Sequence, residues 1–340
     1  MTLDLVPGLI TTREEVAASY GGSVYSGGMV PAPNSKMVFV YSDPAAGQKH
    51  GYTFDGWAED DDFGPLYLYT GAGAEGHQQM VRGNKVLLDT LTNGYEVHLF
   101  VSNGKAPGKK LVMQRYVGRV VVDAVEPYEE RWAPGSDKVM RRVFVFRLRP
   151  AEGATMDVAE TDSVLPATQT MVVELTEKPP APKTAKVPAQ TGAKDKKTEQ
   201  HATAQTTANI PGGARTVRRR EGQLCTAFEE FLIAAGHKTK SFQITVKGEP
   251  GAFTPDLYDV TDNALYEAKG LATRNNVRMA IGQLFDYRRH LDVPAGLRLA
   301  VLLPGEPTAD VRALLDAENI ALVTQTTDGF AGFPLPSAGA

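Results

Sequence analysis

The sequence predicts two domains of different class: a mainly-β domain at the N-terminus and an α/β domain at the C-terminus, joined by a linker. Three observations support this prediction. The 340 residues suffice for two ordinary domains. Segments rich in β-branched and aromatic residues fill the first 150 positions. A stretch rich in Pro, Ala, Thr and Lys then precedes a region in which helix and strand patterns alternate.

The N-terminal domain, residues 1–150, is expected to form a curved sheet or barrel with few helices. Strands are expected at 37–42, 66–70, 95–102, 111–126 and 141–150, each bounded by Gly, Pro, Asp or Asn. A first helix is expected at 11–20, with Thr11 or Thr12 as its cap and Glu14 or Glu15 behind the cap. A second helix is expected to begin near Gln78.

Residues 151–215 are expected to form a flexible linker. This segment is rich in Pro, Ala, Thr, Lys and Gln, and no aromatic residue occurs between Phe146 and Phe228. Such a composition cannot bury enough apolar surface to offset the entropy lost on ordering. The exception is 168–176, which could be a last edge strand.

The C-terminal domain, residues 216–340, shows the order helix, three strands, helix, strand, helix, strand. The helices are expected at 217–236, 275–291 and 308–320, and the strands at 241–248, 252–261, 264–270, 297–304 and 321–326. This order predicts a mixed sheet flanked by helices.

Composition narrows the classes of function. The single cysteine, Cys225, excludes an internal disulfide framework and a Cys-rich zinc site. The net charge of −4 gives no global sign of nucleic-acid binding, although an average can hide a basic face. No apolar run approaches the roughly 18 residues of a membrane span, and the N-terminus lacks the pattern of a signal peptide. We therefore expect a cytoplasmic protein that does not contact a membrane.

Acidic and basic side chains converge on the predicted strand pair of the C-terminal domain. Glu267 and Lys269 are two residues apart on one strand and share a face, and Asp256 lies on the preceding strand, across a short turn. Oxygen ligands in this arrangement suit Mg²⁺, with Mn²⁺ as a substitute, and a metal-polarised water can attack a phosphodiester. The alternative is that these side chains are solvated charges on the edge of a strand, because isolated D…ExK patterns are common.

These residues resemble the motif of the PD-(D/E)XK nucleases. The resemblance implies that Asp256 and Glu267 hold the metal and that Lys269 activates or orients water. It also implies a third acid on the preceding helix, at Glu229 or Glu230, and a supporting role for Gln283 beside the lysine.

The stretch LYLYTGAGAEGHQQMVRGN, residues 66–84, begins as a strand, breaks at Gly71 and Gly73, and lacks the GK[ST] of a phosphate-binding loop. A flipped base offers two apolar faces and one polar edge. Two aromatic side chains can stack on the faces, an acidic acceptor can bind the exocyclic amine of cytosine, and glycines allow the backbone to approach closely.

Residues 5–150 resemble the SET-and-RING-associated (SRA) domain, a PUA-like curved barrel that flips out a modified cytosine. The resemblance is densest at 51–88. It implies that the base-binding residues are Trp57, Asp60, Tyr69, Thr70 and Gly71. Trp57 and Tyr69 would stack on the base and Asp60 would read its amine. The alternative is that the two rings are ordinary core residues and that the acidic loop is solvated.

The sequence departs from the SRA pattern at several positions. Trp57 replaces a tyrosine, His77 replaces an aspartate in the segment 77–87, and the loop after Gly73 is short. These departures leave the modification open between 5-methylcytosine, 5-hydroxymethylcytosine and a bulkier group. His77 is expected to pack or to form hydrogen bonds rather than to catalyse.

Together the two resemblances predict a modification-dependent restriction endonuclease of type IV or type IIM, acting on double-stranded DNA with a modified cytosine. Because each chain has one nuclease centre, we expect a homodimer or a DNA-induced dimer. A flexible linker of 40 residues would span roughly 35 Å, which predicts cutting at variable distances. The alternatives are a modified-DNA reader with an inactive nuclease-like domain and a repair nuclease acting on unmodified DNA.

Overall fold

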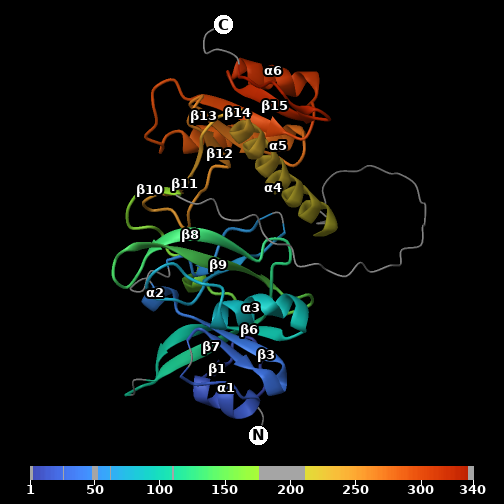
Figure 1. Cartoon of the computed structure of the whole chain (residues 1–340). Coiled ribbons are helices and arrows are strands. Elements are labelled where there is room, and N and C mark those ends of the chain that lie inside the picture. The colour runs from blue at the N-terminus through green and yellow to red at the C-terminus, as the bar shows by residue number, and fades with distance from the viewer. Residues whose placement is uncertain are drawn as a thin grey trace, which may run out of the picture.

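The computed structural model describes residues 3–25, 27–47, 53–61, 63–108, 111–175 and 211–335. They form two units stacked one above the other, an N-terminal unit and a C-terminal unit, each built around its own sheet (Figure 1). No helix in the part of the chain that the structure describes is both long and apolar enough to span a membrane.

The N-terminal unit is built on a nine-stranded sheet. Its strands are β1 (Ile10–Thr11), β2 (Met29–Ala32), β3 (Met37–Ser42), β4 (Gly56–Trp57), β5 (Tyr67–Thr70), β6 (Glu96–Lys105), β7 (Val112–Val122), β8 (Tyr128–Pro134) and β9 (Met140–Pro150). The order is β2-β3-β6-β7-β9-β5-β4, with β1 added to β7 and β8 added to β9. Among the described residues β2 and β4 do not pair with each other, so the expected barrel is not closed.

Short helices accompany this sheet: α1 (Arg13–Tyr20), α2 (Pro44–Gly47), α3 (Arg82–Asn93) and the 3₁₀ turns η1 (Pro33–Ser35) and η3 (Glu160–Asp162). The side chain of Thr12 caps α1, and the side chain of Glu15 bonds back to the Thr12 amide, as a capping box requires. The expectation that the second helix begins near Gln78 is wrong: α3 begins at Arg82, because the Gln78 side chain is used to hold the preceding loop.

The C-terminal unit is built on a seven-stranded mixed sheet in the order β10-β11-β12-β13-β14-β15-β16. Its strands are β10 (Met171–Leu175), β11 (Thr239–Thr245), β12 (Leu257–Asp259), β13 (Ala264–Ala268), β14 (Arg298–Leu303), β15 (Ala321–Thr326) and β16 (Gly329–Ala331). Its helices are α4 (Pro211–Ala234), α5 (Arg274–Tyr287) and α6 (Ala309–Ala317). From α4 to β15 the element order is the one expected from the sequence.

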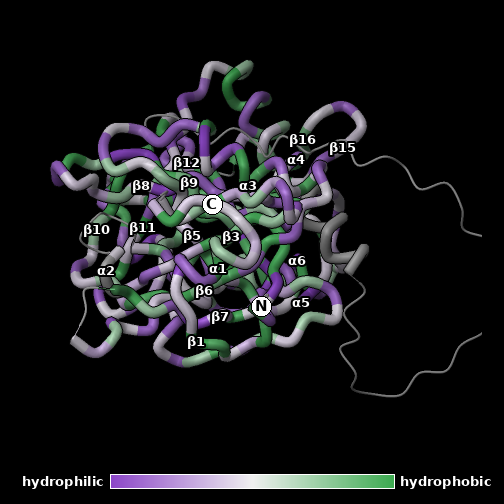
Figure 2. Tube along the Cα trace, turned by 90° about the horizontal axis from the view of Figure 1, so that it is seen from below, coloured by the Kyte–Doolittle hydropathy of each residue, from purple (hydrophilic) through white to green (hydrophobic). Residues whose placement is uncertain are grey.

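Two cores lie on the opposite faces of this sheet. On one face Phe228 of α4 packs against Tyr266 of β13, with ring centroids 4.9 Å apart. On the other face Leu284 of α5 joins a cluster with Leu265 of β13. The pattern follows from strand alternation, because neighbouring residues of β13 point to opposite sides. In the view from below, hydrophobic segments run through the middle of the molecule near β3 and β5, and many outlying loops are hydrophilic (Figure 2).

The segment 151–175, assigned to the linker from the sequence, has a defined place. Residues 163–164 run beside β4, where the Val164 amide donates to the carbonyl of Trp57 at 2.9 Å. The expected edge strand is β10, and it pairs with β11 of the C-terminal unit rather than with the N-terminal sheet. The rest of the expected linker up to α4, residues 176–210, lies outside the described residues.

Candidate functional site

A cluster of three carboxylates and one lysine lies where α4 crosses β13. Glu267 is on β13, Lys269 follows that strand, Asp256 precedes β12 and Glu221 is on α4. Lys269 Nζ lies 2.7 Å from Glu267 Oε1 and 3.4 Å from Glu221 Oε1. Asp256 Oδ2 accepts a 2.7 Å hydrogen bond from the amide of Ala268, which holds that carboxylate beside β13. Asp256, Glu267 and Lys269 are therefore brought together, as the sequence predicts.

Burial and mutual repulsion shape the charges of this cluster. Glu267 and Lys269 are almost fully buried. Burial and the charge of Asp256 raise the pKa of Glu267 well above its usual range. Burial alone would lower the pKa of Lys269, but the charges of Glu267 and Glu221 outweigh it and raise that pKa. The lysine is therefore an ammonium that neutralises part of the acidic cluster.

The donor set of the cluster fits a hard divalent cation. One oxygen from each of Glu221, Asp256 and Glu267 lies within 4.8 Å of the others. Glu267 Oε2 is buried and has no hydrogen-bond partner among the described residues. Mg²⁺ takes oxygen ligands, so these carboxylates match its preference, and the unpartnered oxygen has a free lone pair to offer.

The third acid of the cluster differs from the sequence prediction. The assignment of Glu229 to the site is wrong, because Glu229 accepts a 3.0 Å hydrogen bond from the hydroxyl of Thr239, at the start of β11. Its neighbour Glu230 is exposed and is not in the cluster. Glu221, about two helical turns earlier, takes the position instead. The charge pattern of the helix offers no signal for this choice, which depends on where α4 crosses the sheet.

Gln283 lies on α5 beside Tyr287. Its Nε2 lies 3.2 Å from the hydroxyl of Tyr287, and its Oε1 is buried without a hydrogen-bond partner among the described residues. Burial and the nearby charge of Glu267 raise the pKa of Tyr287, so this pair borders the carboxylate cluster. No hydrogen bond between Gln283 and Lys269 occurs among the described residues.

The two aromatic residues expected to stack on a base lie on the buried face of β4 and β5. Trp57 pairs in register with Tyr67, and Tyr69 is two residues further along β5, so the three rings share one face. Trp57 packs edge-to-face on Tyr67, with centroids 5.2 Å apart, and both predicted stacking residues belong to the core of the unit. Trp57 Nε1 is buried and has no hydrogen-bond partner among the described residues.

The carboxylates of the acidic loop after β4 lie in different environments. Asp60 is exposed. Asp61 pairs with Arg147 at 2.6 Å and with Arg149 at 2.8 Å, which ties the loop to β9. Asp62 lies outside the described residues. The predicted base-reading carboxylate of Asp60 is therefore at the surface of the loop.

A buried acid that the sequence analysis did not single out lies beside these rings. Asp55 immediately precedes β4, is 6% exposed, and accepts hydrogen bonds from the Thr70 amide at 2.7 Å and from the Ser42 hydroxyl at 3.2 Å. Burial raises the pKa of Asp55 to about 6, although these hydrogen bonds oppose the rise. Asp55 thus fixes Thr70, one of the predicted base-binding residues, through its backbone. The signal available in the sequence was its position two residues before Trp57.

The glycine-containing loop after β5 is held by two amide side chains. Gln78 Oε1 accepts from the Phe144 amide at 2.9 Å, and Gln78 Nε2 donates to the carbonyl of Gly71. Asn84 accepts from the Ala72 amide at 2.7 Å and donates to its carbonyl at 3.0 Å. A Cβ on Gly71 would lie 2.8 Å from the Asn84 amide oxygen. The glycine is needed here because the side chains of Asn84 and Gln78 occupy the space that a Cβ would take.

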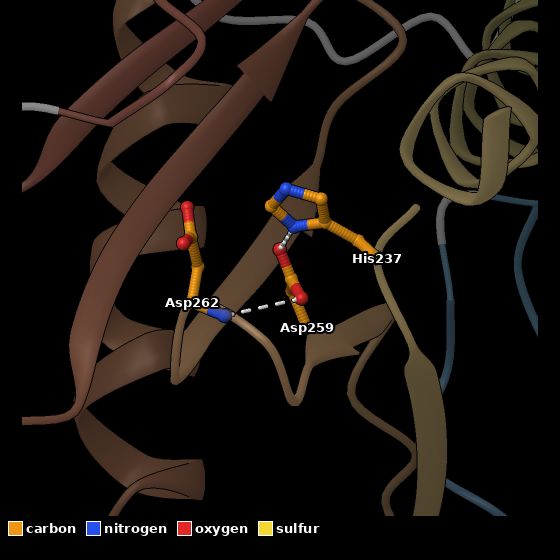
Figure 3. A group of neighbouring side chains, drawn as sticks. All are labelled: His237, Asp259 and Asp262. Carbon is orange, nitrogen blue, oxygen red and sulfur yellow. Dashed lines mark hydrogen bonds and ion pairs between the residues drawn. The ribbon is translucent and has the colours of Figure 1, made fainter. Parts of the chain in front are cut away.

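A second group of possible ligands, His237, Asp259 and Asp262, lies at the hairpin between β12 and β13 (Figure 3). The contacts of these three residues show that they stabilise a turn. Asp259 pairs with His237 Nδ1 at 2.6 Å and accepts hydrogen bonds from the amides of Thr261 and Asp262. The carboxylate of Asp262 pairs instead with Arg298 at 2.9 Å. The group therefore holds the turn that presents Glu267.

Comparison with known proteins identifies the N-terminal unit. Residues 8–167 match the family described as "ScoMcrA-like, SRA domain", so this part of the chain is an SRA domain of ScoMcrA-like type. The match ends before β10. No curated protein matches the sequence.

Three solved structures are similar to less than half of this chain. The sulfur binding domain and SRA domain of ScoMcrA complexed with phosphorothioated DNA is 23% identical over 44% of this chain and 40% of that chain, with a TM-score of 0.33. The type IV phosphorothioation-dependent restriction endonuclease ScoMcrA is 23% identical over 44% of this chain and 27% of that chain, with a TM-score of 0.33. The SUVH5 SRA domain with fully methylated CG DNA is 18% identical over 47% of this chain and 97% of that chain, with a TM-score of 0.31. The matches thus span less than half of each ScoMcrA chain.

Proposed function

We propose that this protein is a modification-dependent DNA endonuclease. Its SRA domain recognises a modified cytosine, 5-methyl- or 5-hydroxymethylcytosine, in double-stranded DNA, and its C-terminal unit hydrolyses phosphodiesters with Mg²⁺ or Mn²⁺. The observation that carries the proposal is the presence, in one chain, of an SRA domain and of a buried cluster of Glu221, Asp256, Glu267 and Lys269.

Each member of the cluster has a role in hydrolysis. Glu221, Asp256 and Glu267 would hold the cation, which supplies a polarised water and neutralises phosphate charge when it is bound. Lys269, held 2.7 Å from Glu267, presents an ammonium that orients the attacking water and stabilises the charge growing on the phosphate. The water adds to phosphorus and gives up a proton to solvent, the bond to one bridging oxygen breaks, and the departing oxygen takes up a proton.

The proposed base site uses the face of Trp57 and Tyr69 together with the acidic loop. The unpartnered Nε1 of Trp57 supports a ligand at this face, because a buried donor without an acceptor is costly. Asp60, which is exposed, would read the exocyclic amine from the loop.

A digestion series tests the proposal. Matched duplexes carry cytosine, 5-methylcytosine, 5-hydroxymethylcytosine or a phosphorothioate, and each is incubated with Mg²⁺ or with a chelator. We expect cleavage of duplexes with a modified cytosine when Mg²⁺ is present, and none when the chelator replaces it. Equal cleavage of all four duplexes would indicate a nuclease for unmodified DNA. Tight binding of modified DNA without cleavage would indicate a reader with an inactive nuclease-like unit.

The number of copies follows from the stoichiometry of the cluster. Each chain brings one carboxylate–lysine cluster, so a double-strand break requires two chains or two successive events. We propose that two copies assemble on DNA, as a homodimer or as a DNA-induced dimer. Light scattering with and without a modified duplex distinguishes the two cases.

A further inference from the structure

The outer edge of β8 is closed by a side chain from the other unit. Among the strands that the structure describes, β8 pairs only with β9 in the N-terminal sheet, which leaves its far edge open for another partner. At this edge the amide of Trp132 donates to Gln243 Oε1 at 2.7 Å, and Gln243 Nε2 donates to the carbonyl of Trp132 at 2.9 Å. Figure 1 shows β8 beneath β10 and β11 at the junction of the two units.

Gln243 is built to make this contact. It lies on β11, where its neighbour Ile244 enters the apolar core of the C-terminal unit. Because side chains alternate along a strand, Gln243 points away from that core. It is only 2% exposed, since the N-terminal unit covers it. A planar amide that donates and accepts at one residue fixes both the separation and the orientation of the two strands.

A short segment, residues 166–170, reinforces this contact, and we call it the strap. The amide of Ala167 donates to the carbonyl of Glu249 at 2.8 Å, and the amide of Gly248 donates back to Ala167 at 2.9 Å. The amide of Lys247 then donates to the Thr170 hydroxyl at 2.9 Å. Directly afterwards β10 pairs with β11 along its whole length. The chain is therefore anchored to the C-terminal sheet before residue 176.

The anchoring of β10 determines which two elements the segment 176–210 connects. The segment connects β10 to α4, and both elements belong to the C-terminal unit. Its length therefore does not set the distance between the SRA domain and the carboxylate cluster. The connection that does set this distance is the strap itself, residues 166–170, which leads directly into β10. The prediction of cutting at variable distances assumed that this segment joins the two units, and the pairing of β10 with β11 removes that assumption.

Trp132, which forms the hydrogen bonds with Gln243, also contacts the loop that follows β5. The ring of His77 lies edge-to-face on Trp132, with centroids 5.4 Å apart. His77 Nδ1 accepts a 3.0 Å hydrogen bond from the Arg142 amide, so the ring is held to β9 as well. The loop after β5, which carries Gly71, therefore contacts Trp132, the residue that Gln243 of the C-terminal unit hydrogen-bonds.

From these contacts we infer that Gln243 and the strap 166–170 hold the carboxylate cluster at one defined place relative to the SRA domain, so that DNA is cut at one defined distance from the modified base. Gln243 is a positioning residue: it touches neither DNA nor metal and acts through Trp132. The inference rests on the proposed function, because it assumes that the cluster cuts DNA bound by the SRA domain.

The test maps cut positions on an end-labelled duplex that contains a single modified cytosine. Wild-type protein should cut each strand at one dominant position. Gln243→Ala, and a flexible insertion of about 12 Gly and Ser residues after Gln169, should scatter the cuts. Such an insertion has a span of roughly 20 Å, or about six base pairs at 3.4 Å each. Affinity for the modified duplex, measured by gel shift, should stay within about twofold of wild type.

Two matched controls separate positioning from stability. Gln325→Ala removes an exposed glutamine from β15 of the same sheet and should leave the cut position unchanged. The same insertion placed within 176–210 should also leave it unchanged, because both ends of that segment lie in one unit. Thermal unfolding of each variant checks that the fold is kept.

The outcomes are distinct. Scattered cutting by wild-type protein, or a single position in both Gln243→Ala and the strap insertion, overturns the inference alone. Equal scatter from the insertion in 176–210 overturns it as well, because that segment would then be the tether. Absence of cleavage of any modified duplex by wild-type protein overturns the proposed function and the inference with it.

Discussion

The carboxylate of Glu221 lies 3.4 Å from the ammonium of Lys269, although 48 residues separate them in the chain. This contact brings α4 into the carboxylate cluster and supplies the third acid. It also places the acid about two turns before Glu229, one of the two positions that the resemblance to the PD-(D/E)XK nucleases implied. The consequence can be tested by substitution along one helix.

Glu221→Gln should weaken Mg²⁺-dependent cleavage, whereas Glu229→Gln should not. Removing one oxygen ligand should lower the apparent affinity for Mg²⁺ by at least about 10–100-fold, the loss typical even of groups that only support metal ligands. Cleavage rate against Mg²⁺ concentration is the measurement. Glu229→Gln is the matched control, since it keeps an acceptor for Thr239. Equal losses in both variants would mean that α4 contributes only to stability.

Lys269→Ala should bind modified DNA like the wild type and fail to cut it. The side chain lies in the C-terminal unit, away from the SRA domain, and its loss leaves all three carboxylates in place. Loss of one positioned donor should lower the cleavage rate by about 10²–10³-fold. Gel shift and digestion on the same duplex provide the paired measurement. Near wild-type cutting would refute the assignment of Lys269.

Binding of Mg²⁺ should release protons and strengthen as the pH rises. Burial and the charge of Asp256 raise the pKa of Glu267, so a proton competes with the cation for this carboxylate. Titration calorimetry in two buffers of different ionisation enthalpy measures the protons released. Glu267→Gln removes the competing carboxylate and should abolish this release. A heat of binding independent of the buffer would contradict the prediction.

Asp60→Ala should lower the preference for modified DNA without affecting the fold, because Asp60 is exposed. An unpaired amine on the base should cost roughly 1–3 kcal/mol of binding free energy. Competition between modified and unmodified duplexes measures the preference. An unchanged preference would show that the loop does not read the base.

Trp57→Ala and Tyr69→Ala should instead destabilise the SRA domain, by about 3–5 kcal/mol each, because both rings belong to its core. Denaturant unfolding measures this loss. Trp57→Phe is the matched milder change: it keeps an aromatic face and removes the unpartnered Nε1. A loss of modified-base preference in Trp57→Phe, with unfolding near wild type, would assign Nε1 of Trp57 to base recognition.

Asp55→Asn should stabilise the protein above pH 6 and have little effect near pH 4. Burial raises the pKa of Asp55 from its ordinary 3.8 to about 6 in the folded state. The folded protein therefore binds the proton more tightly, and the free energy of unfolding falls as the pH rises from about 4 to about 6 and then levels off. The ionised carboxylate costs about 3 kcal/mol, and asparagine can keep the bonds to Thr70 and Ser42 without it. Chemical unfolding at pH 4.5 and pH 7.5 measures the difference, with Asp60→Asn as an exposed control.

Local patterns in the sequence predicted much of the fold. The capping box of Thr12 and Glu15 lies within one turn, so it can be read from spacing alone. The element order of the C-terminal unit follows from hydrophobic periodicity, which depends on each segment by itself. Asp256, Glu267 and Lys269 were found because a hairpin brings its two strands together at a short distance in the chain.

The remaining features depend on packing between distant segments, and no local pattern carries them. The closure of the sheet depends on whether its outermost strands meet, and β2 and β4 do not pair among the described residues. The burial of Asp55 and the exposure of Asp60 depend on how the loop after β4 is tied to Arg147 and Arg149. Composition marks 151–215 as a segment without aromatic residues. It does not show that β10 pairs with β11, which lies far along the chain.

Residues that are neighbours along the chain, or along one hairpin, are enough to specify the two kinds of domain, the SRA-type character of the first, and the spacing of the two acids and the lysine in the second. Two contacts are specified by no such local pattern. One is the position of Glu221 in the carboxylate cluster, and the other is the pair of hydrogen bonds between Gln243 and Trp132. Both contacts join residues 48 or more positions apart, and such pairs are set by the docking of whole helices and sheets, whose buried surfaces select one arrangement that periodicity and spacing do not encode.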